Sequence, residues 1–455
     1  MNPALVRKFR KKLGAHRVLE NPPAEFASDK WFASRAPELV VFPGNTEETA
    51  FVLHEAYRAG IPVTPRGAGY GYVGGCTPVN GGIVLCLERM KRILEINPED
   101  FVAVVEPGVI TGELQEAVRA KGLFYPPDPA SLKDCSIGGN IATNAGGPRC
   151  LKYGVTRNYI LGLTVVLPNG KIVRCGGRTH KNKTGFDLVG LFTGSEGLLG
   201  VVTQATLRLL PHPPARAVLS AGFPTIEAAA KSIREVFAGG FLPAALEIAD
   251  EFTLKSARAF NPKAEFPPGR AQVLIEVDGQ IQSVKSEAAA LAGVLKKTGA
   301  LGIRKDTTPG ACEALWGLRR LYSQSLKSTG LKKLNEDIVV PRGRLVDLVK
   351  FAARLQKQHG FPVACFGHAG DGNIHVNIMV ADMEKPSVRK KAERALDELF
   401  AQVLAWNGAI TGEHGIGIAK KPWWNAAVSA ESRHLHKTLK AALDPKGLLN
   451  PGKFV

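Results

Sequence analysis

Three glycine-rich stretches constrain the fold of this chain more than any other feature. They are "PRGAGYGYVGG" (65–75), "YPPDPASLKDCSIGGNIATNAGGPRCLKYG" (125–154) and "FTGSEGLLG" (192–200). A plain surface loop can also be rich in glycine, but loops longer than about 12–15 residues inside a compact domain are usually functional. Short apolar runs separate the stretches, so the region from 37 to 212 is predicted to be α+β with many loops.

The first stretch contains a formal GxGxxG at 69–74, with Glu88 at the end of the next apolar run, which is a pattern typical of NAD sites. In a Rossmann site, the glycines open a helix that crosses over to the next strand. Only 76–82 separate this loop from "IVLCL" (83–87), which is too short for such a helix. The exposed amides instead predict an anion-binding nest for a pyrophosphate.

Beyond the proline-rich "PHPPAR" (211–216), the pattern changes to longer helical periods that alternate with strands. We predict four segments: a helical segment at 1–36, a loop-rich domain at 37–213, a second α+β domain at 214–412, and a segment at 413–455 that returns to the first domain. The predicted helices cover 46–59, 111–121, 224–238, 281–299, 344–360 and 386–405, and Asn169-Gly170 predicts a hairpin.

Composition limits the class of protein. Hydrophobic residues make up 45% of the chain, and no run approaches the roughly 20 apolar residues of a membrane-spanning helix. Seven scattered cysteines form no CxxC pair, which favours a reducing, cytoplasmic location and no built-in metal cluster. The net charge of +18 is spread out without a nucleic-acid-binding motif, so we expect no nucleic acid partner.

The first helical pattern, "ALVRKFRKKL" (4–13), places Leu5, Phe9 and Leu13 on one face and basic residues on the others. We prefer a helix that docks on the body of the protein. Contact with a membrane surface is the alternative.

"FGHAGDGNIHVN" (366–377) predicts a tight turn followed by a strand, in which His375 and Asn377 share a face and His368 folds back beside His375. "GEHG" (412–415) adds Glu413 and His414. Two histidines and a carboxylate match the ligands of catalytic zinc and of some manganese or iron sites. Hydrogen-bonded histidines and a carboxylate–histidine pair that braces a loop are the alternatives.

The three glycine-rich stretches together resemble the FAD-linked oxidases of the vanillyl-alcohol oxidase and p-cresol methylhydroxylase superfamily. The resemblance implies an α+β fold: an FAD-binding domain of the p-cresol methylhydroxylase type and an α+β substrate (cap) domain with an antiparallel sheet. It also implies FAD, held without a covalent bond because no histidine or cysteine is placed for attachment. The matching cofactor-binding positions are Arg66, Gly67, Ala68, Gly69, Tyr70, Gly71, Asp128, Ser136, Gly139, Asn140, Asn144, Gly146, Gly154, Glu196, Val202 and Asn450.

The first loop departs from its relatives at Tyr70, Tyr72 and Val73, where threonine, leucine and serine are usual. Two hydroxyls that bond phosphate are therefore missing or moved. The amide nest should survive, because it depends on the backbone.

"GHxGDGNxHxN" followed by "GEHG" resembles the substrate domain of the FAD-linked D-2-hydroxyacid dehydrogenases, which include the glycolate oxidase flavin subunit and D-lactate dehydrogenase. This resemblance implies that a divalent metal (zinc, manganese or iron) is held by His368, His375 and Glu413. It implies His414 as the base, Asn377 as a substrate contact and Arg319 as the clamp of the substrate carboxylate. Asn335 replaces a lysine of some relatives, which favours a small monocarboxylate.

The resulting hypothesis is oxidation of glycolate or D-lactate to the 2-oxo acid by hydride transfer to flavin N5. Electrons would leave for a separate iron–sulfur subunit, quinone or cytochrome. Peripheral association with the inner face of the membrane and a homodimer stay open. The alternatives are a metal-dependent hydrolase that uses His368, His375 and Glu413, and a non-enzymatic basic binding protein.

Overall fold

The computed structural model describes residues 1–455 and divides the chain into two units. The first unit consists of 1–146, 154–212 and 413–455. The second consists of 147–153 and 213–412. Each unit has sheets and a hydrophobic core of its own.

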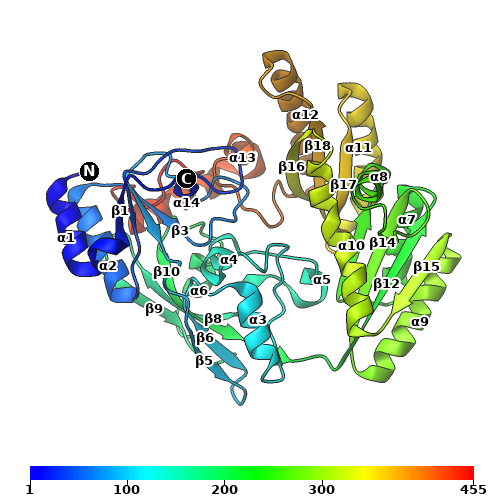
Figure 1. Cartoon of the computed structure of the whole chain (residues 1–455), viewed down its shortest axis with the longest axis horizontal. Coiled ribbons are helices and arrows are strands. Elements are labelled where there is room, and N and C mark those ends of the chain that lie inside the picture. Colours follow the sequence, from blue (N-terminus) through cyan, green and yellow to red (C-terminus); the bar gives the residue numbers. More distant parts are fainter. The chain divides into compact units, whose positions relative to one another are not determined.

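The first unit contains a four-stranded and a five-stranded sheet (Figure 1). The four-stranded sheet, in the order β1-β2-β4-β3, consists of β1 (Val18–Glu20), β2 (Leu39–Val41), β4 (Ile83–Cys86) and β3 (Val63–Arg66). β2 and β3 both pair with β4 in parallel, and the connection 67–82 between β3 and β4 contains no helix. The GxGxxG loop therefore lacks the crossover helix of a Rossmann site.

The five-stranded sheet is antiparallel, in the order β5-β6-β10-β8-β9. Its strands are β5 (Ile93–Asn97), β6 (Val102–Val105), β10 (Val201–Arg208), β8 (Ile160–Val166) and β9 (Ile172–Gly176), and a small pair joins β7 (Leu123–Phe124) to β11 (Leu210–Pro211). β8 and β9 form the hairpin that Asn169-Gly170 predicted, and Gly170 has a φ of 85° that suits glycine.

The helices of the first unit are α1 (Pro3–Leu13), α2 (Thr46–Ala59), α3 (Thr111–Arg119), α4 (Ile137–Thr143), α6 (Leu188–Phe192), α13 (Lys421–Ala427) and α14 (Ala430–Leu443). α1 begins where the Asn2 side chain accepts a hydrogen bond from the Ala4 amide. Its apolar face, with Phe9 fully buried, joins a core formed with α2, β2 and β4. The preferred interpretation of a docked helix is therefore confirmed.

The second unit is built on one antiparallel seven-stranded sheet in the order β15-β12-β14-β13-β17-β18-β16. Its strands are β12 (Ala215–Phe223), β13 (Ala245–Ala249), β14 (Ala271–Gly279), β15 (Gly302–Asp306), β16 (Lys332–Val339), β17 (Val363–His368) and β18 (Asn373–Val380). Its helices are α5 (Cys150–Tyr153), α7 (Ile226–Ala238), α8 (Glu251–Phe260), α9 (Ile281–Lys297), α10 (Pro309–Lys327), α11 (Leu345–His359) and α12 (Pro386–Ala405). The predicted helix at 386–405 is confirmed.

α8 and α10 pack on one face of this sheet. Tyr322 and Leu326 of α10 and Leu254 of α8 form a cluster with Phe366 and Met379 of the sheet. Farther along α10, a second cluster contains Leu315 and Trp316. Side chains at sheet positions between these clusters therefore lie beneath α10, which is where the polar residues described below are found.

The short segment 147–153 is tied to the second unit by polar contacts with β14. Arg149 Nε donates to the Glu276 carboxylate at 2.8 Å, Lys152 Nζ donates to Asp278 at 2.5 Å, and Tyr153 Oη donates to Asp278 at 2.8 Å. Part of the second glycine-rich stretch is thus anchored on a different sheet from the rest of it.

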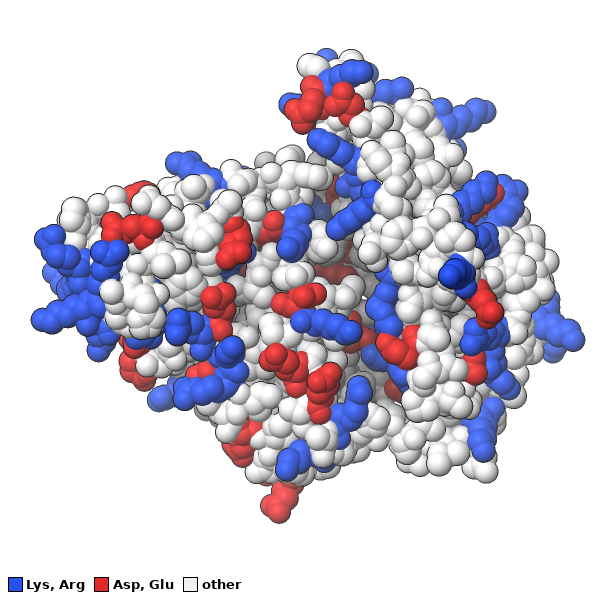
Figure 2. Space-filling view, in the orientation of Figure 1, with Lys and Arg blue, Asp and Glu red and all other residues white.

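No helix of the structure has both the length and the apolar character that a membrane span requires. On the face shown in Figure 2, Lys and Arg side chains are scattered and mixed with Asp and Glu. They gather over α1, where Arg7, Lys8, Arg10, Lys11 and Lys12 are exposed.

Candidate active site

The first glycine-rich loop leaves β3 at Arg66 and lies against the start of α4. A Cβ on Gly67 would be 2.5 Å from Ser136 Oγ, and Gly69 has a φ of 73°. Arg66 is buried, and its Nη1 donates to the Ser28 carbonyl at 2.7 Å. Glycine is needed for this close approach, so the loop presents a side-chain-free cradle that fits the pyrophosphate of a dinucleotide cofactor.

The polar side chains of the second stretch shape its backbone. Ser136 Oγ accepts from the Gly139 amide at 3.3 Å and caps α4. Asn140 is buried and donates through Nδ2 to Thr111 Oγ1 at 2.7 Å. Asn144 has a left-handed φ of 52°, and its Oδ1 accepts from the Arg157 amide at 2.8 Å. These hydrogen bonds cap both ends of α4 and join it to the start of α3.

The C-terminal segment contacts both the first and the third glycine-rich stretches within the first unit. Asn450 is buried, and its Nδ2 donates to the Glu196 carbonyl at 2.9 Å and to the Gly75 carbonyl at 3.0 Å. This one amide therefore joins the first and third glycine-rich stretches. Of the other predicted positions, Asp128 and Gly146 are buried, Val202 lies on β10, and Gly154 has a φ of 82°.

Glu196 has a structural task that the sequence did not indicate. Its carboxylate oxygens accept from the Ile416 amide at 2.7 Å and from the Gly417 amide at 2.8 Å. Burial raises the pKa of Glu196, although these two amide hydrogen bonds oppose the rise. Glu196 thus holds the loop that carries His414.

One departure from the usual loop sequence, Tyr72, contacts the loop that carries His414. The Tyr72 ring stacks on the His414 ring, with centroids 5.2 Å apart and an angle of 29° between the planes. The Val73 carbonyl accepts from the Ile418 amide at 2.8 Å. Tyr72 therefore contacts the predicted base, and the cofactor loop and the His414 loop form one hydrogen-bonded assembly.

In the second unit, β17 and β18 bring two histidines together. β17 ends at His368, a turn follows, and β18 places His375 opposite Phe366. The two imidazole rings lie 5.7 Å apart at an angle of 79°. The predicted approach of His368 to His375 is confirmed.

Glu247 on β13, which sequence reasoning missed, lies at the centre of this face. The strand register pairs Glu247 with His368. One carboxylate oxygen is 2.5 Å from His368 Nδ1, and the other accepts from Arg319 Nε at 2.6 Å. Glu247 is 1% exposed, so the predicted carboxylate clamp and a predicted metal ligand share one buried anion.

The Glu247 carboxylate is ionised, and this charge bears on the protonation of its partner His368. Burial alone would raise the pKa of Glu247, but the charges of His368 and Arg319 and their hydrogen bonds lower it to about 2. With the ionised carboxylate at Nδ1, the proton of a neutral His368 lies on Nδ1, so loss of the imidazolium's second proton leaves the lone pair on Nε2. That tautomer is the one suited to metal ligation.

Glu413 directly follows Gly412, whose backbone is hydrogen-bonded within the second unit. Asp337 on β16 accepts from the Gly412 amide at 2.9 Å and from Thr411 Oγ1 at 3.0 Å. Its other oxygen accepts from Asn373 Nδ2 at 2.7 Å. Ligand atoms of His368, His375 and Glu413 all lie within 4.8 Å of one another, and this donor set fits a divalent metal.

Asn377 lies fully buried on the same strand face as His375. Its Nδ2 donates to the Ala364 and His375 carbonyls, each at 3.0 Å, so the amide cannot turn over without losing both bonds. Its Oδ1 is buried and has no hydrogen-bond partner. An unpartnered buried acceptor of this kind is costly unless a ligand donates to it.

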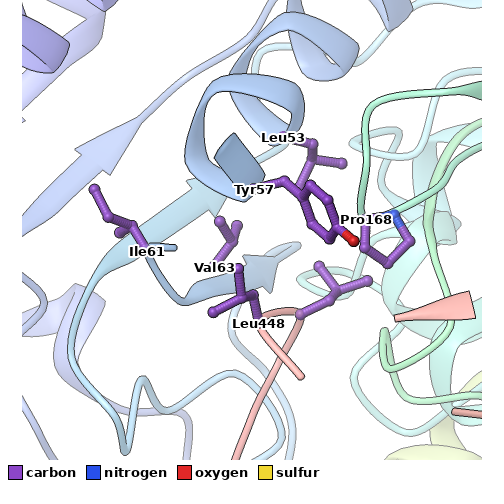
Figure 3. Close-up of a pocket in the computed structure, with 7 residues that line it drawn as sticks. Leu53, Tyr57, Ile61, Val63, Pro168 and Leu448 are labelled. Atoms are coloured by element: carbon purple, nitrogen blue, oxygen red, sulfur yellow. The ribbon is translucent and has the colours of Figure 1, made fainter. Parts of the chain in front are cut away.

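The first unit also contains a small apolar pocket. It is lined by Leu53, Tyr57, Ile61, Val63, Pro168, Leu448 and Leu449 (Figure 3). Apart from the tyrosine hydroxyl its lining side chains are apolar. Such a lining offers neither a metal ligand nor a base, so we do not place the chemistry there.

Comparison with known proteins identifies the class. Residues 37–176 match the model "FAD binding domain", and residues 212–454 match the model "FAD linked oxidases, C-terminal domain". The fold and these matches define an FAD-binding flavoprotein oxidoreductase of the p-cresol methylhydroxylase type.

More particularly, this chain belongs to the FAD-linked oxidase family. It is 40% identical to the glycolate oxidase subunit GlcD of Bacillus subtilis over 92% of this chain and 89% of that protein. It is 32% identical to the D-lactate dehydrogenase of Anaerostipes hadrus over 100% of this chain and 98% of that protein. The structure of p-cresol methylhydroxylase with bound substrate shares the fold, with a TM-score of 0.76, 20% identity and coverage of 99% and 96%.

Proposed function

We propose that this protein oxidises a small D-2-hydroxy acid, such as glycolate or D-lactate, to the 2-oxo acid with FAD as the oxidant. The names of its glycolate oxidase and D-lactate dehydrogenase relatives support the substrate class. The observation that carries the proposal is the Glu247 carboxylate, which orients a guanidinium and an imidazole at the same place. A hydroxy acid needs both: a cation for its carboxylate and polar groups for its hydroxyl.

Arg319 would bind the substrate carboxylate. Only its Nε is used by Glu247, and the guanidinium lies 4.9 Å from the Phe366 ring centroid and 5.4 Å from that of Tyr322. These contacts fix the plane of the guanidinium, so its terminal N–H groups can meet a carboxylate in a defined orientation. This binding would thereby orient the hydrogen on the substrate carbon for transfer to the flavin.

His368, His375 and Glu413 would hold a divalent zinc, manganese or iron ion. Such an ion would supply positive charge that lowers the pKa of the substrate hydroxyl. Glu247 would keep Nε2 of His368 available as a ligand, and Asp337 would hold the backbone from which Glu413 extends. Asn377 Oδ1 would accept a hydrogen bond from the substrate.

His414 would take the hydroxyl proton on a ring nitrogen. The Tyr72 ring and the Glu196 carboxylate would restrict the movement of the loop that carries it. The hydride on the carbon that bears this hydroxyl would pass to bound FAD, which supplies the oxidising chemistry. The amides of 66–71 and the segments around Ser136, Glu196 and Asn450 would hold FAD without a covalent bond.

A separate acceptor would take the electrons from reduced FAD: an iron–sulfur subunit, a quinone or a cytochrome. The relative GlcD is named as a subunit, which agrees with this division of labour. The exposed basic residues of α1 offer a surface for such a partner or for an anionic membrane face. The hydrolase alternative finds no support, because both family models are FAD-linked.

The test of the base is His414→Ala. The purified variant should keep the yellow colour of bound FAD but lose anaerobic bleaching by D-lactate and glycolate. His434→Ala, which removes an exposed histidine of α14, is the matched control and should bleach normally. Normal bleaching by His414→Ala would exclude the assigned role.

The metal is tested independently of the base. Dialysis against a chelator should abolish bleaching, and readdition of Zn²⁺ or Mn²⁺ should restore it. Full turnover by protein with no detectable metal would contradict the metal assignment while leaving the flavin chemistry in place.

A further inference from the structure

A short segment before β2 lies along the first glycine-rich loop. It comprises residues 28–33, which precede the part of the chain (37–176) that matches the FAD-binding model. Three hydrogen bonds join the segment to the loop: from Arg66 Nη1 to the Ser28 carbonyl at 2.7 Å, from the Lys30 amide to the Gly71 carbonyl at 2.9 Å, and from Thr77 Oγ1 to the Ala33 carbonyl at 3.3 Å. The segment therefore holds the loop at its start, at its middle and just beyond its end.

Asp29 lies at the centre of these contacts. It is 8% exposed, and its Oδ2 accepts a hydrogen bond from the Gly75 amide at 3.0 Å, while its Oδ1 accepts from the Trp31 amide at 2.8 Å. A Cβ on Gly71 would be only 2.9 Å from the same Oδ2. The second half of the loop therefore bends around this carboxylate, and glycine at position 71 leaves room for it.

The Asp29 carboxylate is held at an electrostatic cost to the fold. Burial raises the pKa of Asp29, and the hydrogen bonds from backbone amides and the positive charge of Arg66 oppose this rise without cancelling it. A carboxyl group whose pKa is raised in the folded state destabilises the fold at neutral pH. Stability alone thus gives no reason for an acidic residue here, and groups perturbed in this way are concentrated at functional sites.

The backbone amides of the loop divide into two groups. The Gly75 amide is bonded to Asp29, whereas the amides of 67–71, which are predicted to bind the pyrophosphate, donate to no backbone carbonyl. Five of the nine residues from 67 to 75 are glycine, so the loop would lose much conformational freedom on binding unless the protein already held it. Fixing the second half of the loop at Asp29 therefore orders the amides of the first half before FAD binds.

We propose that residues 28–33 belong to the cofactor site and that Asp29 is a positioning residue for FAD, whose pyrophosphate binds the amides that Asp29 keeps in order. Asp29 is itself an anion, so its charge repels a pyrophosphate while its hydrogen bonds order the loop. The two effects have opposite signs: loss of ordering weakens FAD binding, whereas loss of repulsion strengthens it. Ordering is the larger effect here. FAD binding follows from the family, so this inference does not depend on the substrate.

Asp29→Asn tests this assignment, because asparagine supplies one acceptor oxygen where aspartate supplies two. Full-length apo protein is titrated with FAD, and the quenching of flavin fluorescence gives Kd. Kd should rise about 10- to 100-fold for Asp29→Asn, the range expected for loss of one hydrogen bond to a charged group, and should rise further for Asp29→Ala. Glu25→Gln, which neutralises an exposed carboxylate four residues earlier, is the matched control and should leave Kd unchanged.

The Tm of the apo protein separates positioning from a merely structural role. Apo Asp29→Asn should stay within about 4 °C of wild type, because removal of a buried charge offsets the lost hydrogen bond. An unchanged or lower Kd for FAD would overturn the proposal. A larger fall in Tm, or failure of the apo variant to fold, would also overturn it, because either result assigns Asp29 to the fold. Failure of hydroxy acids to reduce bound flavin would instead refute the proposed function and leave the Kd comparison intact.

Discussion

Replacing Glu247 by glutamine removes the negative charge that His368 and Arg319 share while keeping the side chain's size. The pKa of Glu247 falls from an ordinary 4.5 to about 2 in the folded protein. At 1.36 kcal/mol per unit of pKa, that difference corresponds to about 3 kcal/mol of stability at neutral pH. Breaking a buried ion pair costs a similar amount, about 3–5 kcal/mol.

The dependence on pH follows from the sign of this change. A carboxylate with a lowered pKa stabilises the fold above its unfolded-state pKa and loses that contribution as the pH falls through the folded value. The difference between wild type and Glu247→Gln should therefore be complete at pH 7 and shrink between pH 4.5 and about 2.

Thermal unfolding of apo protein measures the effect. For a unit of about 200 residues, roughly 3 kcal/mol corresponds to a fall in Tm of about 6–12 °C. Glu265→Gln is the control, because Glu265 is 87% exposed and should shift Tm by little. Metal titration supplies a second readout: loss of the carboxylate behind a histidine ligand typically weakens metal binding 10- to 100-fold. An unchanged Tm at pH 7 would refute the assignment of Glu247 as a shared buried anion.

Three further changes test other parts of the structure. Gly69→Ala should lower the FAD content of purified protein, since Gly69 has a φ of 73° and an added Cβ would collide with the Arg66 guanidinium; the flavin-to-protein absorbance ratio measures it. Tyr72→Leu should keep FAD but slow its reduction by substrate, and Tyr72→Phe should restore the rate in stopped-flow traces, because the ring that stacks on His414 is retained. Phe9→Ala should cost about 3–5 kcal/mol in denaturant unfolding, because Phe9 is fully buried in the core under α1.

Local patterns were sufficient to predict several elements. The helices at 46–59 and 386–405 follow from amphipathic periodicity, and α2 begins and ends at an asparagine N-cap and a left-handed glycine, which are readable signals. The hairpin at Asn169-Gly170 follows from its turn residues. The shared face of His375 and Asn377 follows from strand alternation alone.

Glu247 could not be found in that way. It is one acidic residue within "ALEIA" (245–249), a run in which every residue is buried. An acidic residue inside an apolar strand is unusual enough to be noticed, because buried carboxylates are normally paired. Its partner, however, lies 121 residues away, and only the pairing of β13 with β17 brings the two together.

The same distinction separates ligands from the residues that orient them. Histidine and glutamate ligands can be proposed from motif spacing, since "GHxGDGNxH" and "GEHG" contain them. Glu247 and Asp337, by contrast, come from strands that contain no motif, yet each fixes one predicted ligand: Glu247 sets the His368 tautomer, and Asp337 holds the Gly412 amide before Glu413. Both carboxylates have protein partners already, so they are better suited to orient ligands than to bind the metal. The sheet register, which no single stretch of sequence encodes, therefore determines whether the motif residues can act together.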